Sequence, residues 1–383
     1  MVVTVKHSIL SGEVQAPLSK SIMQRLCAAA LISNGTTIIM NPGKSNDDKA
    51  ALGIIEKLGA NVNSHQDGAL EICKKEINLS DNEIDCGESG LSIRMFTPIA
   101  ALSNQEILIS GHGSLLKRPM DVFDKILPAL GVEIQSNKGY LPLRIKGPLI
   151  PRDIEIEGSV SSQFLSGLLF AFVAAKAEGV TIKVKDLKSK PYIDLTLEVL
   201  KQFGAEIINR NYEEFYFPQS HALNGKISFV EADWSGAAFL LVAGAISGKV
   251  TVKGLNLHSS QADKSILDVL TECGANIILN QSEITIEKKE LKPFHFDATD
   301  CPDLFPPLVA LAAHCQGVSV IKGTHRLVHK ESNRALALQA EFGKMGINIQ
   351  LIDDIMIING GDTLINSHVN SHNDHRIAMA CAV

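Results

Sequence analysis

The stretch IDLTLEVLKQFGAEI, residues 193–207, decides the fold because its pattern returns along the chain. Apolar residues follow a helical spacing up to position 203, a glycine stands at 204, and a short strand pattern begins. Glycine adopts at little cost the left-handed backbone conformation that ends many helices. The stretch therefore predicts an amphipathic helix, a tight turn and a strand in succession.

This pattern of helix, glycine and strand recurs at a nearly constant spacing. The phrases KLGANV, ALGVEI, QFGAEI, ECGANI and KMGINI place glycines at 59, 131, 204, 274 and 346, so the gaps are 72, 73, 70 and 72 residues. A fixed period of this kind is typical of one structural unit repeated along a chain.

A second, more apolar helix pattern keeps the same period. Its segments begin at Ser21, Ser92, Ser162, Ser235, Asp303 and Asp374. Segments such as GLLFAFVAA are apolar around most of their circumference, so we expect buried helices. Each unit then has a buried helix, a strand, an amphipathic helix and further short strands. The sixth segment reaches residue 383 before its glycine and strand, so we expect six units with the last incomplete.

We expect an α/β fold in which the units form two groups of three. The fourth apolar helix starts near residue 231, and about 210 residues is a reasonable domain size. The prediction is therefore one domain of residues 18–230 and another of residues 1–17 and 231–383. Residues 1–15 are expected to form a strand without a helix of its own, which we pair with the second group.

Composition excludes several classes of protein. Among 383 residues, 45% are hydrophobic and the net charge is −6, which argues against a general nucleic-acid binder. The seven cysteines lack CxxC spacing, so we expect reduced thiols in a cytosol rather than a disulfide framework. The longest apolar run, FLSGLLFAFVAA, is too short to span a bilayer, and the N-terminus lacks a signal-peptide pattern. We expect a cytoplasmic monomer without membrane or nucleic-acid partners.

Cations and hydroxyls gather at the starts of the first three buried helices. The first start carries Lys20 and Arg25, the second carries Gly90 and Arg94, and the third reads SVSSQF. Unpaired backbone N–H groups at a helix start favour an anion, and nearby cations strengthen that preference. The pattern predicts a site for a substrate, or a pair of substrates, with several negative charges.

The second half carries carboxylates at the equivalent starts: Asp233, Asp303 and Asp374. They could be helix N-caps or acid–base groups, and Ser21 and Ser92 could likewise be N-caps only. Two loops add cations, LLKRPM with Arg118 and HKESNR with Arg334. Each of these arginines could instead be a solvated surface charge, as a lone arginine often is. The stretch SHNDH has residue types that can bind a metal. What favours anion binding is the repetition of cations at corresponding places in several units.

Seven stretches, in order, resemble the 5-enolpyruvylshikimate-3-phosphate (EPSP) synthase family from about residue 13 to the end. They are PLSKSIMQR, LLKRPM, SVSSQFLSGLL, SKPYIDLTLEVLKQFG, CPDLFPPLVALA, HKESNR and NDHRIAM. The resemblance implies an inside-out α/β barrel with two domains, each of three βαβαββ units, joined by a two-strand hinge that closes on substrate. It implies transfer of the enolpyruvyl group of phosphoenolpyruvate to the 5-hydroxyl of shikimate 3-phosphate, without a metal or organic cofactor.

The resemblance also implies residue roles. For shikimate 3-phosphate it implies Lys20, Ser21, Arg25, Ser161, Ser162, Gln163, Ser189, Tyr192, Asp303 and Lys330. For phosphoenolpyruvate it implies Lys20, Gly90, Arg118, Gln163, Arg334 and Arg376. The implied catalytic residues are Asp303 as the base at the 5-hydroxyl, with Glu331 and Lys20 moving protons at the methylene carbon and the leaving phosphate. Such acid–base groups typically contribute 10² to 10⁴-fold in rate.

The sequence departs from the family pattern at several positions, of which Glu88 is the most awkward. A carboxylate beside an anion site repels the anion unless it is paired or turned away. Two alternatives stay open: a non-catalytic or truncated homologue that only binds shikimate 3-phosphate, and UDP-N-acetylglucosamine enolpyruvyl transferase. The second usually has a cysteine where this chain has Gly113.

Overall fold

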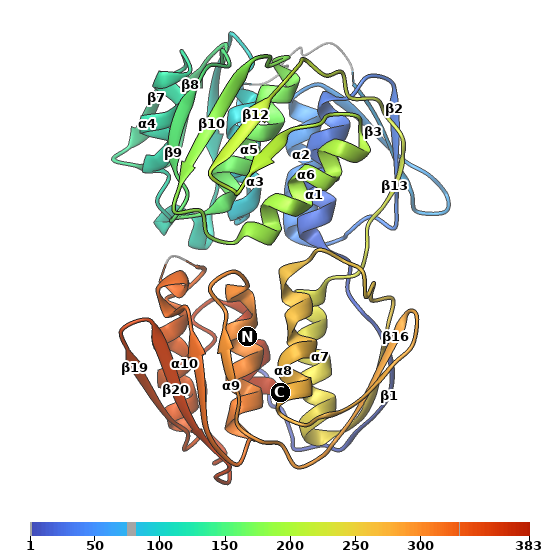
Figure 1. Ribbon diagram of the computed structural model, residues 1–383, viewed down its shortest axis with the longest axis vertical. Coiled ribbons are helices and arrows are strands. Elements are labelled where there is room, and N and C mark those ends of the chain that lie inside the picture. The colour runs from blue at the N-terminus through green and yellow to red at the C-terminus, as the bar shows by residue number, and fades with distance from the viewer. Residues whose placement is uncertain (1, 75–81, 329) are drawn as a thin grey trace. The chain divides into compact units, whose positions relative to one another are not determined.

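The computed structural model describes residues 2–74, 82–328 and 330–383 (Figure 1). Its internal contacts divide the chain into two compact units. Unit 1 comprises Met1–Pro17 and Ala232–Val383, and unit 2 comprises Leu18–Glu231. The sequence predicts a division after residues 17 and 230, and the second boundary in the structure lies one residue later. No helix in the described ranges has both the length and the apolar content that crossing a bilayer requires.

Unit 2 contains three four-stranded sheets with one strand arrangement. In each, an edge strand runs parallel to its neighbour and the other two pairs are antiparallel. The sheets, in strand order, are β13 (Ile227–Phe229), β2 (Thr36–Met40), β4 (Leu70–Lys74) and β3 (Ala60–Ser64); β5 (Glu83–Asp85), β6 (Glu106–Ser110), β8 (Tyr140–Lys146) and β7 (Glu133–Asn137); β9 (Ile154–Glu157), β10 (Val180–Lys185), β12 (Glu214–Phe217) and β11 (Ile208–Arg210).

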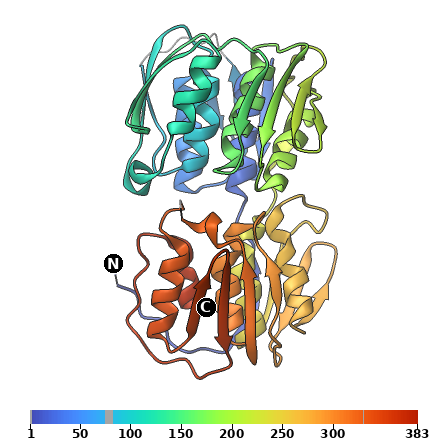
Figure 2. The same cartoon turned by 60° about the vertical axis from the view of Figure 1, so that its left-hand side comes forward.

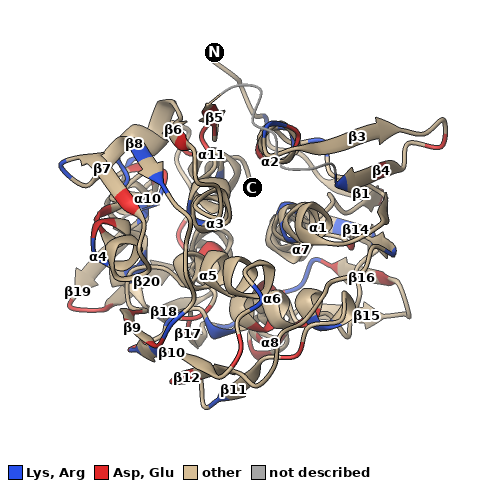
Figure 3. Ribbon diagram, turned by 90° about the horizontal axis from the view of Figure 1, so that it is seen from above, with Lys and Arg blue, Asp and Glu red and all other residues tan. Residues whose placement is uncertain are grey.

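Helices fill the middle of unit 2, and the hairpins lie at its periphery (Figure 3). The buried helices are α1 (Lys20–Ile32), α3 (Gly90–Ala100) and α5 (Ser162–Ala174). The amphipathic helices are α2 (Asn46–Lys57), α4 (Asp121–Ala129) and α6 (Lys190–Gln202), and η1 (Gly113–Lys117) is a 3₁₀ turn. Glycines at 59, 131 and 204 follow the amphipathic helices with φ of 96°, 83° and 106°. The predicted glycine-terminated helices are confirmed.

Helices α3 and α5 approach each other closely enough to require a glycine. A Cβ added to Gly167 would lie 2.5 Å from the carbonyl oxygen of Arg94 and 2.8 Å from that of Met95. These are backbone atoms that cannot move aside cheaply, so a larger residue would force the helices apart. The close packing fixes the starts of α3 and α5 relative to each other.

Unit 1 repeats the same strand arrangement in two sheets, whose strands and helices are shown in Figure 2. The sheets are β1 (Leu10–Gln15), β14 (Gly248–Lys253), β16 (Glu283–Glu287) and β15 (Asn276–Leu279); β17 (His295–Asp297), β18 (Gly317–Lys322), β20 (Ile355–Gly360) and β19 (Asn348–Ile352). The helices are α7 (Trp234–Ser247), α8 (Ile266–Glu272), α9 (Phe305–Ala313), α10 (Arg334–Lys344) and α11 (His375–Ala382), with 3₁₀ turns η2 (Ala262–Ser265), η3 (Pro302–Leu304) and η4 (Thr324–Leu327).

The first strand is shorter than predicted. It begins at Leu10, and residues 2–9 are exposed and lie outside any strand. Its neighbour β14 starts at Gly248, opposite Leu10, so earlier residues have no ladder to join. The predicted pairing of this strand with the second half is confirmed. The strand β13 pairs with β2 in the same way, so both units join a distant strand to their first helix–strand pair.

Candidate functional site

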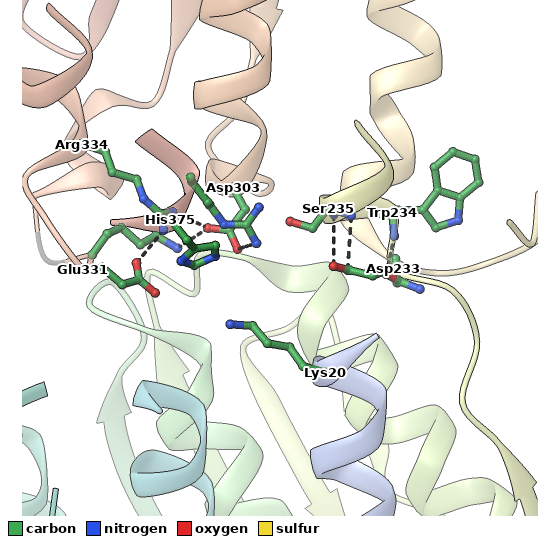
Figure 4. Close-up of polar contacts among 12 residues, drawn as sticks. Lys20, Asp233, Trp234, Ser235, Asp303, Glu331, Arg334 and His375 are labelled. Carbon is green, nitrogen blue, oxygen red and sulfur yellow. Dashed lines mark hydrogen bonds and ion pairs between the residues drawn. The ribbon is translucent and has the colours of Figure 1, made fainter. Parts of the chain in front are cut away.

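Asp303 lies at the centre of a charged cluster in unit 1. It belongs to the 3₁₀ turn before α9, where prolines at 306 and 307 begin the helix. Its Oδ1 accepts from Lys330 Nζ at 3.1 Å and from Arg334 Nη1 at 2.8 Å, and its Oδ2 accepts from Arg376 Nη2 at 3.1 Å. Segments far apart in sequence thus bring three cations to one carboxylate (Figure 4).

Arg334 connects this carboxylate to two others. Its side chain is 1% exposed, and its Nε donates to Asp374 Oδ2 at 2.8 Å while its Nη2 donates to Glu331 Oε2 at 2.6 Å. Asp374 is fully buried and also caps α11 by accepting from the backbone N–H of Arg376 at 3.0 Å. The cluster is a closed network in which each arginine is held by the chain's own carboxylates.

The charges of this network shift its pKa values. Burial alone would raise the pKa of Asp303, but its three cationic partners outweigh burial and hold that pKa well below its usual range. Burial lowers the pKa of Lys330, and the charge of Arg334 adds to the effect, although Asp303 opposes it. Asp303 is therefore ionised at neutral pH.

Arg25 is the buried cation of unit 2. It is fully buried, and its Nε donates to Thr196 Oγ1, its Nη1 to the Ser21 carbonyl and its Nη2 to the Tyr192 carbonyl, each at 2.9 Å. Burial lowers the pKa of Arg25 to about 10, so it remains charged at neutral pH. It ties α1 to α6, and Thr196 Oγ1 also lies 2.9 Å from Ser166 Oγ on α5. Predicted residues Ser21, Arg25 and Tyr192 therefore lie together.

Gly90 and Arg118 also lie together. Gly90 begins α3, and a Cβ there would be 2.3 Å from Arg118 Nη1, so a larger residue would displace this guanidinium. Arg118 is 7% exposed, and its Nε has no hydrogen-bond partner among the described residues. Glu88 does not face this arginine as an ion-pair partner in the described contacts; its Oε2 accepts from the backbone N–H of Ser114 at 3.2 Å. The Glu88 carboxylate therefore accepts a hydrogen bond from the η1 turn.

The start of α5 carries three predicted residues. Ser161 caps the helix by accepting from the backbone N–H of Gln163 at 3.3 Å, and Ser162 is buried. Gln163 Oε1 accepts from Arg94 Nη1 at 3.0 Å, which joins this start to α3. The guanidinium of Arg94 also lies 5.2 Å from the ring centroid of Phe164. The sequence places Arg94 at a helix start, but it does not predict that Arg94 is the partner of Gln163.

Lys20 and Ser189 stand at the starts of α1 and α6. Lys20 Nζ donates to Asp47 Oδ2 at 2.9 Å, and both side chains are partly exposed. Ser189 takes a left-handed conformation with φ of 58°, which is uncommon for a residue other than glycine. The partner Asp47, at the start of α2, was missed because nothing local in the sequence connects it to Lys20.

Buried polar groups also join α1 to α3. Gln24 Oε1 accepts from Ser92 Oγ at 3.0 Å and from Ser89 Oγ at 3.4 Å. The cap of α3 is Ser89 rather than Ser92, and the cap of α1 is Ser19 rather than Ser21. The possibility that Ser21 and Ser92 serve only as caps is therefore excluded.

The predicted residues thus fall into groups within each unit. Unit 1 brings Asp303, Lys330, Glu331, Arg334 and Arg376 into one network. Unit 2 holds Ser21 with Arg25 and Tyr192, Gly90 with Arg118, Ser161 with Gln163, and Lys20 with Asp47. The SHNDH stretch makes protein contacts through His372 and Asp374. In the ranges that the structure describes, no group of three or more His, Cys, Asp or Glu residues has the arrangement of a metal site.

Solved structures share this fold across almost the whole chain. An EPSP synthase from Acinetobacter baumannii has a TM-score of 0.80 and 26% identity, with 99% of this chain and 90% of that chain covered. The enolpyruvyl transferase NikO from Streptomyces tendae has a TM-score of 0.74 and covers 99% and 89%, but at 16% identity it supports the fold alone. The predicted α/β class is confirmed.

Comparison of sequences finds relatives with higher identity to this chain. The 3-phosphoshikimate 1-carboxyvinyltransferase of Clostridium novyi is 36% identical, with 98% of this chain and 88% of the relative covered. The enzyme of the same name from Clostridium botulinum strain Alaska E43 is 37% identical with the same coverage. The family model of EPSP synthase (3-phosphoshikimate 1-carboxyvinyltransferase) matches residues 5–383, and with relatives of this identity along its length the chain belongs to that family.

Proposed function

We propose that this chain transfers the enolpyruvyl group of phosphoenolpyruvate to the 5-hydroxyl of shikimate 3-phosphate. The products are 5-enolpyruvylshikimate 3-phosphate and inorganic phosphate. The observation that carries the proposal is the network around Asp303, in which one ionised carboxylate lies among three cations beside a second carboxylate, Glu331. A reaction that moves protons between anionic reactants needs these groups together.

Unit 2 would bind shikimate 3-phosphate. Its helix starts present Ser21, Ser161 and Ser162, hydroxyls suited to phosphate oxygens beside backbone N–H groups. Arg25 contributes positive charge from a fully buried position, where its guanidinium donates to Thr196, Ser21 and Tyr192. We therefore assign it a long-range electrostatic role and the task of fixing Tyr192. Ser189 and Tyr192 would complete this set from the start of α6.

For phosphoenolpyruvate we propose the residues that the family resemblance implies. The phosphate suits Arg118 and Lys20, with Gly90 giving close access to backbone, and Gln163 is suited to contact either substrate. The carboxylate suits Arg334 and Arg376, because a guanidinium fork matches a carboxylate in two-point geometry. Asp303 occupies these same two guanidinium groups in the structure, so it holds them as the substrate carboxylate would.

The chemistry proceeds by addition and then elimination. A proton is added to the methylene carbon of phosphoenolpyruvate while the 5-hydroxyl oxygen bonds to the adjacent carbon and loses its proton. The tetrahedral intermediate then loses a methyl proton and expels phosphate. Asp303 would take the hydroxyl proton, while Glu331 and Lys20 exchange protons at the methyl carbon and the leaving phosphate, and Lys330 would hold shikimate 3-phosphate.

The low pKa of Asp303 makes it a weak base while its three cations surround it. The substrate carboxylate would compete for Arg334 and Arg376, so their hold on Asp303 would weaken when phosphoenolpyruvate binds. The proton affinity of Asp303 would then rise at the moment when the reaction requires a base. We propose that this exchange of partners activates the base.

We also propose that the chain folds as an inside-out barrel of six units, with α11 as the helix of the sixth. Five sheets of one strand arrangement support it within the residues described. In this scheme unit 2 is the shikimate 3-phosphate domain, and unit 1 carries the acid–base residues and the carboxylate-binding arginines.

Phosphate release with both substrates tests the proposed function. We expect steady release that requires both phosphoenolpyruvate and shikimate 3-phosphate, and no release when UDP-N-acetylglucosamine replaces the second. Saturable binding of shikimate 3-phosphate without release would instead favour the non-catalytic binding protein. Release that depends on the nucleotide sugar would identify the sister reaction.

A further inference from the structure

The segment between β20 and α11, residues 361–374, forms hydrogen bonds with both ends of α10. Near the last turn of α10, Ser367 Oγ donates to the Lys344 carbonyl at 2.6 Å. At the first turn, Arg334 Nε donates to Asp374 Oδ2 at 2.8 Å. The segment therefore returns from the end of α10 to its start, where it delivers residues of the charged network.

Glu341 is the tie between these two ends. Its side chain is 1% exposed, its Oε2 accepts from the backbone N–H of Asn370 at 2.8 Å, and its Oε1 lies 2.7 Å from His372 Nε2. Lys344 Nζ, from the same helix, donates to Oε2 at 2.7 Å. A buried carboxylate is stable only when charged or donating partners surround it. These partners therefore fix both the carboxylate and the segment that supplies two of them.

Lys344 and His372 contact Glu341, and Cys381 lies within its electrostatic field. Burial would raise the pKa of Glu341, but Lys344, the Asn370 N–H and His372 outweigh burial and lower it. On α11, burial raises the pKa of Cys381 to about 11, and the charge of Glu341 adds to that shift. Glu341 is thus an ionised group in contact with α10, with the returning segment and, through its field, with α11.

The backbone directly before Asp374 is held in an unfavourable conformation. His372 has φ of 52° and Asn373 has φ of 56°, so two consecutive residues that are not glycine lie in the left-handed region. Such residues cost free energy and persist only where the surroundings hold them. The His372 side chain contacts Glu341, and the Asp374 N–H donates to the Ser371 carbonyl at 2.8 Å.

We propose that Glu341 is a positioning residue for the proposed reaction. By holding His372 it fixes the left-handed pair, and the pair sets where α11 begins and how Asp374 and Arg376 meet the Asp303 network. Glu341 acts through other residues and is not assigned a contact with substrate. The inference rests on the proposed function for its kinetic effect, but its structural effect is measurable without turnover.

The test replaces Glu341 by Gln and compares it with a matched pair at His372. His372→Leu removes the donor, whereas His372→Gln keeps an N–H that can reach the carboxylate, and the partly exposed His372 site tolerates either. We expect Glu341→Gln and His372→Leu to lower kcat/KM for phosphoenolpyruvate by about tenfold or more, because small misplacements of binding groups are costly. His372→Gln should recover most of that loss, while KM for shikimate 3-phosphate stays near the wild-type value.

Two controls separate positioning from general stability. Ser367→Ala removes another hydrogen bond of the same segment. Lys344→Met removes the half-exposed lysine that pairs with the buried Glu341 and leaves the contacts from Asn370 and His372 in place, so both variants should keep kcat/KM within about twofold. Amide hydrogen exchange provides the measurement independent of activity: Glu341→Gln should lose protection at Asp374 and Arg376, more than either control.

Unchanged exchange at Asp374 and Arg376 in Glu341→Gln would overturn the inference. So would an equal loss of activity in Ser367→Ala, because the effect would then be a general one on the segment. If the wild-type chain released no phosphate from its two substrates, the proposed function would fail, and hydrogen exchange would still decide the role of Glu341. If Glu341→Gln did not fold, the His372 pair would carry the same comparison.

Discussion

The buried helices of unit 2 begin with serine caps, whereas α7 and α11 of unit 1 begin with aspartate caps. The hydroxyls of Ser19, Ser89 and Ser161 accept from backbone N–H groups at the starts of α1, α3 and α5. The carboxylates of Asp233 and Asp374 do the same for α7 and α11. Both residue types satisfy the helix start, but only aspartate adds a full negative charge there.

For the proposed function, this difference implies two ways of binding anions. A serine cap leaves the partial positive charge of the helix start available to a phosphate, and unit 2 adds buried arginines nearby. An aspartate cap neutralises the helix start, and in unit 1 Asp374 instead uses its charge to hold Arg334. In the proposed function, anion binding in unit 1 would therefore rely on arginine side chains, whereas unit 2 would use its helix starts directly.

Replacing Asp374 by Asn is expected to have the largest effect, because it removes the charge and keeps a side chain that can cap. Arg334, 1% exposed, would lose a buried carboxylate partner, and breaking such a pair costs about 3–5 kcal/mol. The free energy of unfolding in urea measures this. A loss below about 1 kcal/mol would mean that Asp303 and Glu331 suffice to hold Arg334, and the cap would then be the main role of Asp374.

Glu331→Gln distinguishes a catalytic carboxylate from a structural one in the same unit. Its Oε2 accepts from Arg334, but its side chain is 23% exposed, so we expect a small loss of stability. We expect kcat to fall at least about a hundredfold, about 2.7 kcal/mol in the barrier, with a modest change in substrate binding. Steady-state kinetics with both substrates checks this, and wild-type turnover would remove Glu331 from the chemistry.

Much of the fold could be predicted because local residues mark where the helices of each unit end. The glycines at 59, 131, 204, 274 and 346 all have positive φ after a helix, as the spacing predicted. The cap positions were misjudged because LSKS and ESGLS each contain two serines, and backbone geometry selects the first. The pairing of β13 with β2 joins residues remote in sequence, so no local pattern signals it.

The site residues could be predicted where they belong to sequence motifs. Asp303, Lys330, Glu331, Arg334 and Arg376 come from three motifs and do meet in one network. The sequence does not predict which of these residues hydrogen-bond to each other, because tertiary packing decides the pairing. The DHR stretch offered a signal for Asp374, since a carboxylate two residues before an arginine can cap the helix that carries it.

Acid should weaken unit 1 through Asp303. Its pKa is lowered in the folded protein relative to the unfolded value near 3.9, so the stabilisation is present above that value and is lost as pH falls through the folded pKa. The effect should be smaller than that of Asp374→Asn, because the Asp303 side chain is 22% exposed. Urea unfolding at pH 7 and pH 3 should show a steeper loss in the wild type than in Asp303→Asn. Parallel losses would assign the acid sensitivity to other carboxylates.

Ser161→Asp gives unit 2 the cap chemistry of unit 1. Aspartate caps as well as serine does, so the free energy of unfolding should change by less than about 0.5 kcal/mol. The added charge at the start of α5 should repel a phosphate and weaken shikimate 3-phosphate binding by about tenfold or more. Calorimetric titration measures the affinity, and Ser161→Asn is the neutral control. Equal affinities of the two variants would show that the helix start does not face the phosphate.

Asp233→Ser makes the reverse exchange and should have the smallest effect. Asp233 accepts from the backbone N–H groups of Ser235 at 3.3 Å and Gly236 at 3.0 Å, and serine can replace one of these bonds. The loss should be about 0.3–1 kcal/mol, the value of a charge at a helix start, whereas Asp233→Ala should cost up to about 2 kcal/mol because the cap itself is lost. Urea unfolding of both variants checks this. If serine were as damaging as alanine, the charge of Asp233 would matter more than its hydrogen bonds, since Arg376 lies within its field.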